Sequence, residues 1–339
     1  MITNGYSGLA AFAAILQIAL GVVVVWFGIR ALRQRAESNQ CVADEADAES
    51  RYYFRLVVGL TLCGVVIAAW PLFYLVLQSY VGQWPGVMCI AGVVRIGASS
   101  ANSASHLPGL VAFMEISKPA LVFLAGSWLV VHVLMQSQRG GRLQRVSVAT
   151  MLTFGLLGVL DGAAEGAYLV IPKQEQALAT GCCTVDSQEA VFANAGPREA
   201  SGGGPLTVAF VAACAWVALW VTASIRRIRM SQDAGYRLAL AAVGAAALVP
   251  LGAIYLREVA APLFLQLPYH QCAYCLVGVA PEALVAVGLF SLATFAVGWA
   301  VIARGLDRSN QAIALPLLRF ARFGFLATLL MLGVRMATA

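Results

Sequence analysis

The segment Cys272-Ala-Tyr-Cys275 is the part of this sequence whose residue types and spacing most directly predict chemistry. It comes shortly before an apolar stretch that begins near residue 282, so the first cysteine is expected at the start of a helix. The positive end of a helix dipole favours the thiolate form of a cysteine there, and the thiolate is the nucleophile. A Cys-x-x-Cys pair in this position is able to cycle between dithiol and disulfide.

The other cysteines are distributed unevenly among the eight in the chain. Cys41 falls in a hydrophilic connection, while Cys63 and Cys214 lie within apolar stretches, where a thiol behaves as a small apolar side chain. The rest are expected in loops or helix mouths on the outward side of a membrane: Cys89, Cys182, Cys183, Cys272 and Cys275. In an oxidising compartment such cysteines form structural disulfides. Because five is an odd number, at least one of these cysteines stays outside any disulfide within the set and is available for another role.

The Cys272/Cys275 pair resembles the Cys-x-x-Cys of membrane thiol oxidoreductases of the DsbB and vitamin K epoxide reductase type. In those proteins the motif lies at the outer end of a four-helix bundle and passes electrons to a quinone. The resemblance covers this motif and a topology. It implies a quinone-proximal role for Cys272 and Cys275, a relay role for Cys182, Cys183 or Cys89, and an extracytoplasmic thiol protein as partner. The chain has twice the helices of that family, and its relay cysteines are adjacent where a spaced pair is usual.

Two other functions fit the same residues. His270 precedes Cys272 by two positions, His106 lies in the first outward loop, and the vicinal pair Cys182-Cys183 suits a soft ion such as Cu(I), Zn(II) or Hg(II). These residues predict soft-metal binding or transport. Alternatively, the cysteines are disulfide staples in a non-enzymatic structural subunit of a larger membrane complex.

Ionisable residues inside two apolar stretches form a second candidate site. Glu115 and Lys118 lie in one stretch, and Asp161 and Glu165 lie in the next. Charges inside a membrane cost about 2.5 to 3.5 kcal/mol each near a helix centre, so they are expected to face the protein interior and to have partners. In an antiparallel helix pair, Lys118 and Asp161 come to equal depth, and so do Glu115 and Glu165. The cluster could be a structural ion pair, a proton path or a site for a quinone headgroup.

The elements that position these residues are predicted from hydropathy. The chain of 339 residues is 60% hydrophobic and 11% charged, with a mean hydropathy of +0.81, and a soluble fold cannot bury that much apolar surface. Apolar blocks of 20 or more residues are long enough to cross a bilayer as helices. The predicted spans are 8 to 29, 56 to 80, 109 to 135, 147 to 171, 206 to 225, 238 to 260, 282 to 303 and 316 to 336. The fold class is therefore an all-α integral membrane protein of about eight transmembrane helices.

Arginine distribution predicts the orientation of these spans. Most of the 22 basic residues lie in the connections after the first, third, fifth and seventh spans, so those connections are expected in the cytoplasm and both termini outside. The expected location is the plasma (inner) membrane, with the lipid bilayer and other membrane subunits as partners. The net charge of +6 comes largely from the arginines of these cytoplasmic connections. It therefore needs no nucleic-acid partner to explain it, and none is predicted.

Two further patterns concern helix packing and duplication. Gly158, Gly162 and Gly166 are spaced by four, which places them on one helix face and predicts a close helix contact. Segments 88 to 93 and 274 to 279 share Cys, Gly and Val at matching positions, as two four-helix repeats would. The repeats would be 1–146 and 147–339, or the halves 1–172 and 206–339, within one membrane domain. The sequence contains no P-loop, dinucleotide fingerprint, zinc-protease helix or serine elbow.

Overall fold

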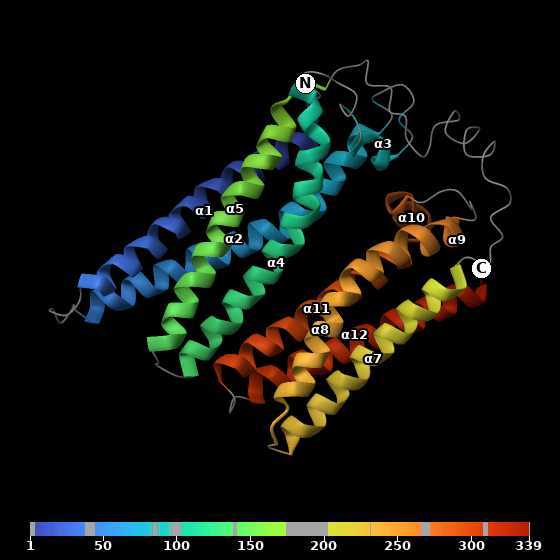
Figure 1. The fold of residues 1–339 in the computed structure, drawn as a ribbon. Helices are drawn as coiled ribbons and strands as arrows, with labels where there is room; N and C mark the ends of the chain where they lie inside the picture. Colours follow the sequence, from blue (N-terminus) through green and yellow to red (C-terminus); the bar gives the residue numbers. More distant parts are fainter. Residues whose placement is uncertain are drawn as a thin grey trace. The chain divides into compact units, whose positions relative to one another are not determined.

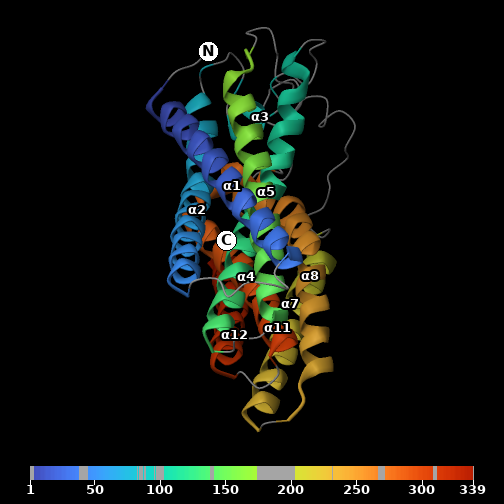
Figure 2. The same ribbon diagram turned by 90° about the vertical axis from the view of Figure 1, so that its left-hand side faces the viewer.

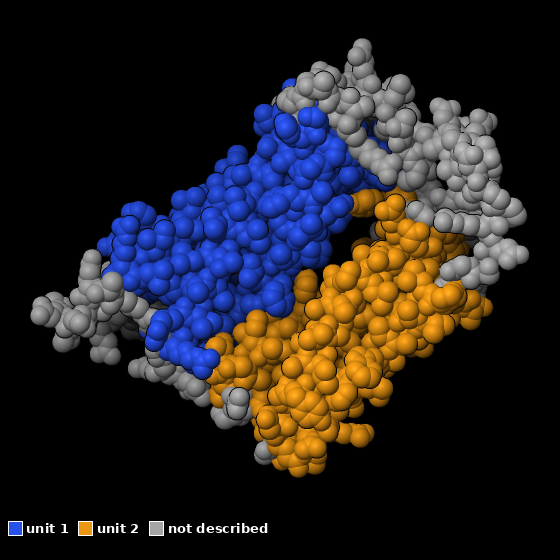
Figure 3. All heavy atoms as spheres, viewed as in Figure 1, with its two compact units in different colours: residues 1–179 blue, residues 180–339 orange. Residues whose placement is uncertain are grey.

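All regular elements in the described part of the chain are helices (Figure 1). The computed structural model describes residues 4–37, 45–81, 83, 87, 89–94, 96, 103–137, 141–173, 203–230, 232–265, 272–307 and 311–338. The chain divides into two compact units, Met1–Ala179 and Thr180–Ala339, coloured separately in Figure 3. Each unit has its own apolar core and is described by itself.

Unit 1 is a bundle of four long helices with two short helical pieces. Its elements are α1 (Gly5–Glu37), α2 (Glu45–Tyr80), α3 (Ile90–Val94), the 3-10 helix η1 (Ser103–His106), α4 (Leu107–Ser137) and α5 (Gly141–Val170). The four long helices form a closed ring, because α1 contacts α2 and α5, and α4 contacts the same two helices. Figure 2 shows α1 lying across α5. This ring places α4 and α5 side by side, as the short connection between them predicts.

Unit 2 repeats this ring order with its own four long helices. Its elements are α7 (Gly203–Arg229), α8 (Gly235–Tyr255), the π-helical segment η3 (Leu256–Ala260), α9 (Ala261–Leu265), α10 (Ala273–Val279), α11 (Pro281–Leu306) and α12 (Gln311–Thr338). α7 contacts α8 and α12, and α11 contacts the same two. Phe210 stacks on Tyr255 with ring centroids 4.5 Å apart and also contacts Phe290, so aromatic rings fill part of this core.

The prediction of eight membrane-spanning helices is confirmed. The described chain contains eight helices long and apolar enough to cross a membrane: Gly5–Arg33, Tyr53–Tyr80, Ala104–Gln136, Arg142–Val170, Gly204–Arg229, Gly235–Leu265, Pro281–Leu306 and Gln311–Ala337. Many of their large apolar side chains are exposed, including Phe12, Ile116 and Leu219, which suits a lipid surrounding. The protein is therefore a multi-pass helical membrane protein. Its orientation and the proposed duplication stay predictions.

The closest helix contact in unit 1 joins α1 and α5 through glycines. A Cβ atom at Gly21 would lie 2.9 Å from the carbonyl oxygen of Gly155, and one at Gly162 would lie 3.0 Å from that of Ala14. Of the glycines predicted to form the contact, Gly162 does so. Gly158 is more loosely packed, and a Cβ at Gly166 would meet nothing within 4 Å.

Candidate functional site

A buried ionic cluster occupies the interior of unit 1, where α4 and α5 pack together. Lys118 of α4 places its Nζ 3.1 Å from Oδ2 of Asp161 and 2.7 Å from Oε2 of Glu165, both on α5. All three side chains are at most 2% exposed. Asp161 and Glu165 are one helical turn apart, so they share the α5 face that meets α4. One ammonium group therefore contacts two carboxylates in an apolar environment.

Asp161 is the more fully hydrogen-bonded of the two carboxyl groups. Ser117 donates its hydroxyl to Oδ1, while Oδ2 accepts from Lys118 and from Nε2 of Gln17 at 3.0 Å. Gln17 is fully buried on α1 and also donates to the carbonyl oxygen of Gly158 at 2.9 Å. Three neutral or cationic donors thus compensate the charge of Asp161.

Glu165 has fewer partners than Asp161. Its Oε2 accepts from Lys118, whereas its Oε1 is buried without a hydrogen-bond partner. The Oε1 of Gln17 and the hydroxyl of Tyr168 are also buried without partners. Unsatisfied buried polar atoms are rare and costly, so three of them around one ionic cluster make it a candidate functional region.

Aromatic rings and a second lysine surround the cluster on its Tyr168 side. The ring of Phe73, on α2, lies 5.3 Å from Nζ of Lys118 and packs edge-on against Tyr168. Lys173, just beyond the end of α5, donates to the carbonyl oxygen of Tyr168 at 2.6 Å. Its Nζ is 4.3 Å from the ring centroid of Tyr168 and 5.4 Å from that of Tyr80. Burial lowers the pKa of Lys173 to about 8.

Glu115 is placed apart from the other residues predicted for this site. It lies on an exposed face of α4, although it is three residues from Lys118 and thus within a turn of it. The structure therefore brings Lys118, Asp161 and Glu165 together and leaves Glu115 on the surface of the bundle.

The Cys-x-x-Cys pair lies in unit 2 at the start of the short helix α10. Cys272 is the residue before the first turn, and its carbonyl oxygen accepts from the backbone of Leu276. The Sγ atoms of Cys272 and Cys275 lie within 4.8 Å of each other. Cys272 is 3% exposed, whereas Cys275 is partly exposed. A disulfide between them would require the Sγ atoms to approach to about 2.05 Å.

The position of this pair differs in one respect from the prediction. α10 ends at Val279, and the spanning helix α11 begins separately at Pro281. The helix that starts at the pair therefore has seven residues, so its dipole is much smaller than that of a spanning helix. The structure therefore supports thiol chemistry at this pair through the short distance between the two sulfurs, and not through a strong helix dipole.

The remaining residues predicted for the cysteine site are only partly within the described chain. Cys89 is buried directly before α3 in unit 1, and His106 is an exposed residue at the end of η1. Cys182, Cys183 and His270 lie outside the described residues. None of the cysteines that the structure describes is joined in a disulfide.

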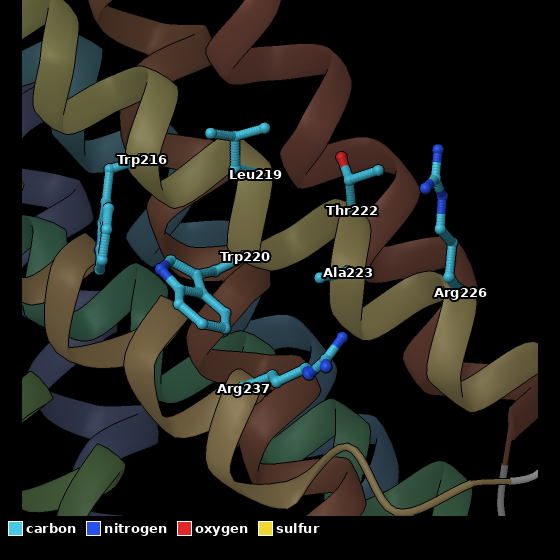
Figure 4. Close-up of a pocket in the computed structure, with 7 residues that line it drawn as sticks. All are labelled: Trp216, Leu219, Trp220, Thr222, Ala223, Arg226 and Arg237. Atoms are coloured by element: carbon cyan, nitrogen blue, oxygen red, sulfur yellow. The ribbon is translucent and has the colours of Figure 1, made fainter.

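An open groove of about 430 Å³ on the surface of unit 2 is a separate feature (Figure 4). Trp216, Leu219 and Trp220 of α7 form its apolar wall, and Arg226 and Arg237 line it as well. Trp216 and Leu219 are exposed. The sequence indicated these arginines as part of a basic connection but did not indicate the groove.

Sequence reasoning missed three members of the ionic cluster: Gln17, Ser117 and Tyr168. Gln17 carried a detectable signal, since an amide in the middle of an otherwise apolar span is as unusual as a charge. Ser117 carried none, because serine hydroxyls in membrane helices commonly bond to their own backbone. Tyr168 carried none either, because it lies near the end of its span, where tyrosine is common at the membrane interface.

Comparisons with known proteins identify no relative: no protein-family model, no curated protein and no solved structure matches this chain.

Proposed function

We propose that this multi-pass membrane protein carries out thiol–disulfide exchange through Cys272 and Cys275, linked to electron transfer in the membrane. The observation that carries the proposal is the separation of the two sulfurs, within 4.8 Å, at the start of α10. Oxidation of this pair to a disulfide brings the two Sγ atoms from within 4.8 Å to about 2.05 Å.

The exposure of the two cysteines suggests the order of the steps. A thiolate of a substrate dithiol attacks Sγ of Cys275, the more exposed sulfur, in the disulfide form of the pair. The S–S bond breaks, and Cys272 leaves as a thiolate and takes up a proton. The second thiol of the substrate then attacks the mixed disulfide, which gives the substrate disulfide and releases the thiol of Cys275.

Re-oxidation completes the cycle. The Cys272/Cys275 dithiol gives two electrons and two protons to a quinone, which becomes a quinol, and the disulfide forms again. In the orientation predicted from arginine distribution, Cys89, Cys182 and Cys183 are on the same side of the membrane as this pair, and we assign them to the relay that receives electrons from an extracytoplasmic thiol protein. The plasma (inner) membrane is the expected location.

Thiol trapping with a mass-tagged maleimide tests the proposal on the purified full-length protein. The protein is reduced, exposed to a soluble quinone, quenched with acid and labelled after denaturation. We expect the quinone to protect two thiols in the wild type, and we expect C272S and C275S each to abolish that protection. C214S is the matched control, because Cys214 is fully buried in the core of unit 2, and it should behave as the wild type.

Other outcomes separate the alternatives. Labelling of both thiols after quinone treatment, in protein that remains folded, contradicts the redox proposal. Protection of the pair by Zn(II) or Cd(II) without oxidation supports the soft-metal alternative, since two nearby thiolates are ligands that such ions prefer. Cysteines that resist reduction under every condition support a structural subunit with disulfide-stapled loops.

A further inference from the structure

The face of α5 that points into unit 1 carries a line of buried polar side chains. Asp161, Glu165 and Tyr168 follow at intervals of four and three residues, so their side chains lie above one another along the helix. They are 1%, 1% and 2% exposed. Lys173 continues the line beyond the end of the helix through its hydrogen bond to the carbonyl oxygen of Tyr168. The line thus joins the interior of the bundle to one end of it.

The charges at the inner end of this line do not balance. With every group ionised, one ammonium of Lys118 faces the carboxylates of Asp161 and Glu165, which leaves one uncompensated negative charge. An unpaired charge in an apolar interior is strongly unfavourable. One proton bound to either carboxylate makes the cluster neutral, and two acids that share a dry site commonly hold a proton in this way.

Hydrogen bonding indicates which carboxylate takes the proton. Asp161 accepts from Ser117, Gln17 and Lys118, and these donors stabilise its anion. Oε1 of Glu165 has no donor directed at it, so the anion of Glu165 is the less compensated one. A proton on this oxygen removes the charge without breaking the contact between Oε2 and Lys118.

We propose that Glu165, held between Lys118 and Tyr168, is an exchangeable proton-binding site inside the membrane, and that the proton reaches it from the Lys173 end of α5. In the binding step a hydronium ion transfers its proton to Oε1 of Glu165, so a water molecule and a neutral carboxylic acid result. The site lies in unit 1 and does not depend on the thiol chemistry of Cys272 and Cys275.

The route rests on groups that are already close to one another. Glu165 and Tyr168 are neighbours on one helix face, and both Oε1 of Glu165 and the hydroxyl of Tyr168 are buried without a hydrogen-bond partner. Nζ of Lys173 is 4.3 Å from the Tyr168 ring. Burial lowers the pKa of Lys173 to about 8, so this amine binds and releases a proton near neutral pH. Lys173 is only partly buried, and we assign it to proton exchange with the solvent at this end of α5.

Each helix around Glu165 contributes a different kind of group. α1 contributes the uncharged amide of Gln17, and α4 contributes Lys118. α2 contributes two rings, that of Phe73 beside Lys118 and that of Tyr80 beside Lys173. The other acid of α4, Glu115, is on an exposed face. Lys118 and Asp161 are thus the charged groups that set the proton affinity of Glu165.

Infrared spectroscopy of the full-length protein in lipid nanodiscs tests this site directly. A neutral carboxylic acid has a carbonyl absorption that the carboxylate lacks. We expect the wild type to show one such absorption at neutral pH, where carboxyls exposed to water are ionised. This absorption should titrate with pH, and we expect E165Q to lose it. E115Q is the matched control, since it removes a glutamate of the neighbouring helix that faces outward, and it should keep the titrating absorption.

A measurement on the wild type keeps the test valid if E165Q does not fold. With ¹³C in the glutamate side-chain carboxyl, the titrating absorption shifts to lower frequency if a glutamate carries the proton. Persistence of the shifted absorption in the E115Q background excludes Glu115, which is the other glutamate within the described membrane spans of unit 1. A titrating absorption that persists in E165Q, that does not shift on labelling, or that is absent from the wild type would overturn the proposal.

The route is tested by the rate at which the same absorption shifts after transfer to D₂O. We expect Y168F and K173M to slow the exchange by about tenfold, which corresponds to about 1.4 kcal/mol on the barrier. Y74F is the control, because Tyr74 is on α2 and the hydrogen bond that Glu165 accepts comes from Lys118; this change should leave the rate unchanged. Exchange at the wild-type rate in both Y168F and K173M would overturn the route.

Discussion

Replacement of Lys118 by Met removes the ammonium group that both buried carboxylates contact. The side chain of Met has a similar length, so the change is mainly one of charge. The Nζ atom lies 3.1 Å from Asp161 and 2.7 Å from Glu165, and removal of one partner of a buried ion pair costs about 3–5 kcal/mol. We expect Lys118→Met to lower the free energy of unfolding by about this amount near neutral pH.

The size of this loss should depend on pH. Without the ammonium, the carboxyls of the folded variant have to bind about one more proton than those of the folded wild type, whereas the carboxyls of the two unfolded chains bind equal numbers. A native state that binds extra protons loses stability as the pH rises, by about 1.36 kcal/mol per pH unit for one proton. The destabilisation is therefore expected to grow with pH above about 5, where unfolded carboxyls are ionised.

Reversible unfolding in mixed micelles, followed by tryptophan fluorescence at several pH values, measures both quantities. Lys118→Arg keeps the positive charge and should retain most of the stability and the wild-type pH dependence. Glu115→Gln changes an exposed residue of the same helix and should stay within about 0.5 kcal/mol of the wild type. A loss below about 1 kcal/mol for Lys118→Met, with no change over the pH range, would refute the role assigned to this charge.

Three further measurements probe other parts of the structure. Gly162→Val should destabilise unit 1 by about 1–3 kcal/mol in the same unfolding assay, because its side chain meets the backbone of α1, whereas Gly166→Ala should be tolerated. Amine labelling of Lys173 should rise with a midpoint near pH 8, well below the usual range for lysine, because burial disfavours its charged form; a midpoint above about 10 would contradict this. Phe210→Ala should cost about 3–5 kcal/mol through loss of the stack on Tyr255, and a change below about 1 kcal/mol would show that this stack does not stabilise the core.

Sequence reasoning about the ionic cluster succeeded for the depth of each charged residue in the membrane. The short connection between α4 and α5 makes these helices antiparallel neighbours, so counting residues from their ends was enough to pair Lys118 with Asp161. Counting could not give the rotation of α4 about its own axis. Lys118 and Glu115 are three residues apart, and packing turned the lysine inward and left the glutamate on the surface.

The cysteine pair shows a similar division. The spacing of Cys272 and Cys275 was enough to predict that their side chains are near each other, because residues three apart lie on adjacent positions of one helical turn. The break between α10 and α11 at Ala280 was not predicted. It matters because it separates the pair from the long helix whose dipole was expected to act on it.

Hydropathy along the chain was sufficient to predict eight membrane-spanning helices, because each apolar block has to satisfy its backbone hydrogen bonds internally when water is excluded. Which side chains meet inside unit 1 depends instead on how the folded helices pack. Gln17 reaches Asp161 across 144 positions of the chain, and it does so because glycines of α1 and α5 allow those two helices to approach closely. Contacts of that kind depend on the rotation and separation of whole helices, which local residue patterns do not encode.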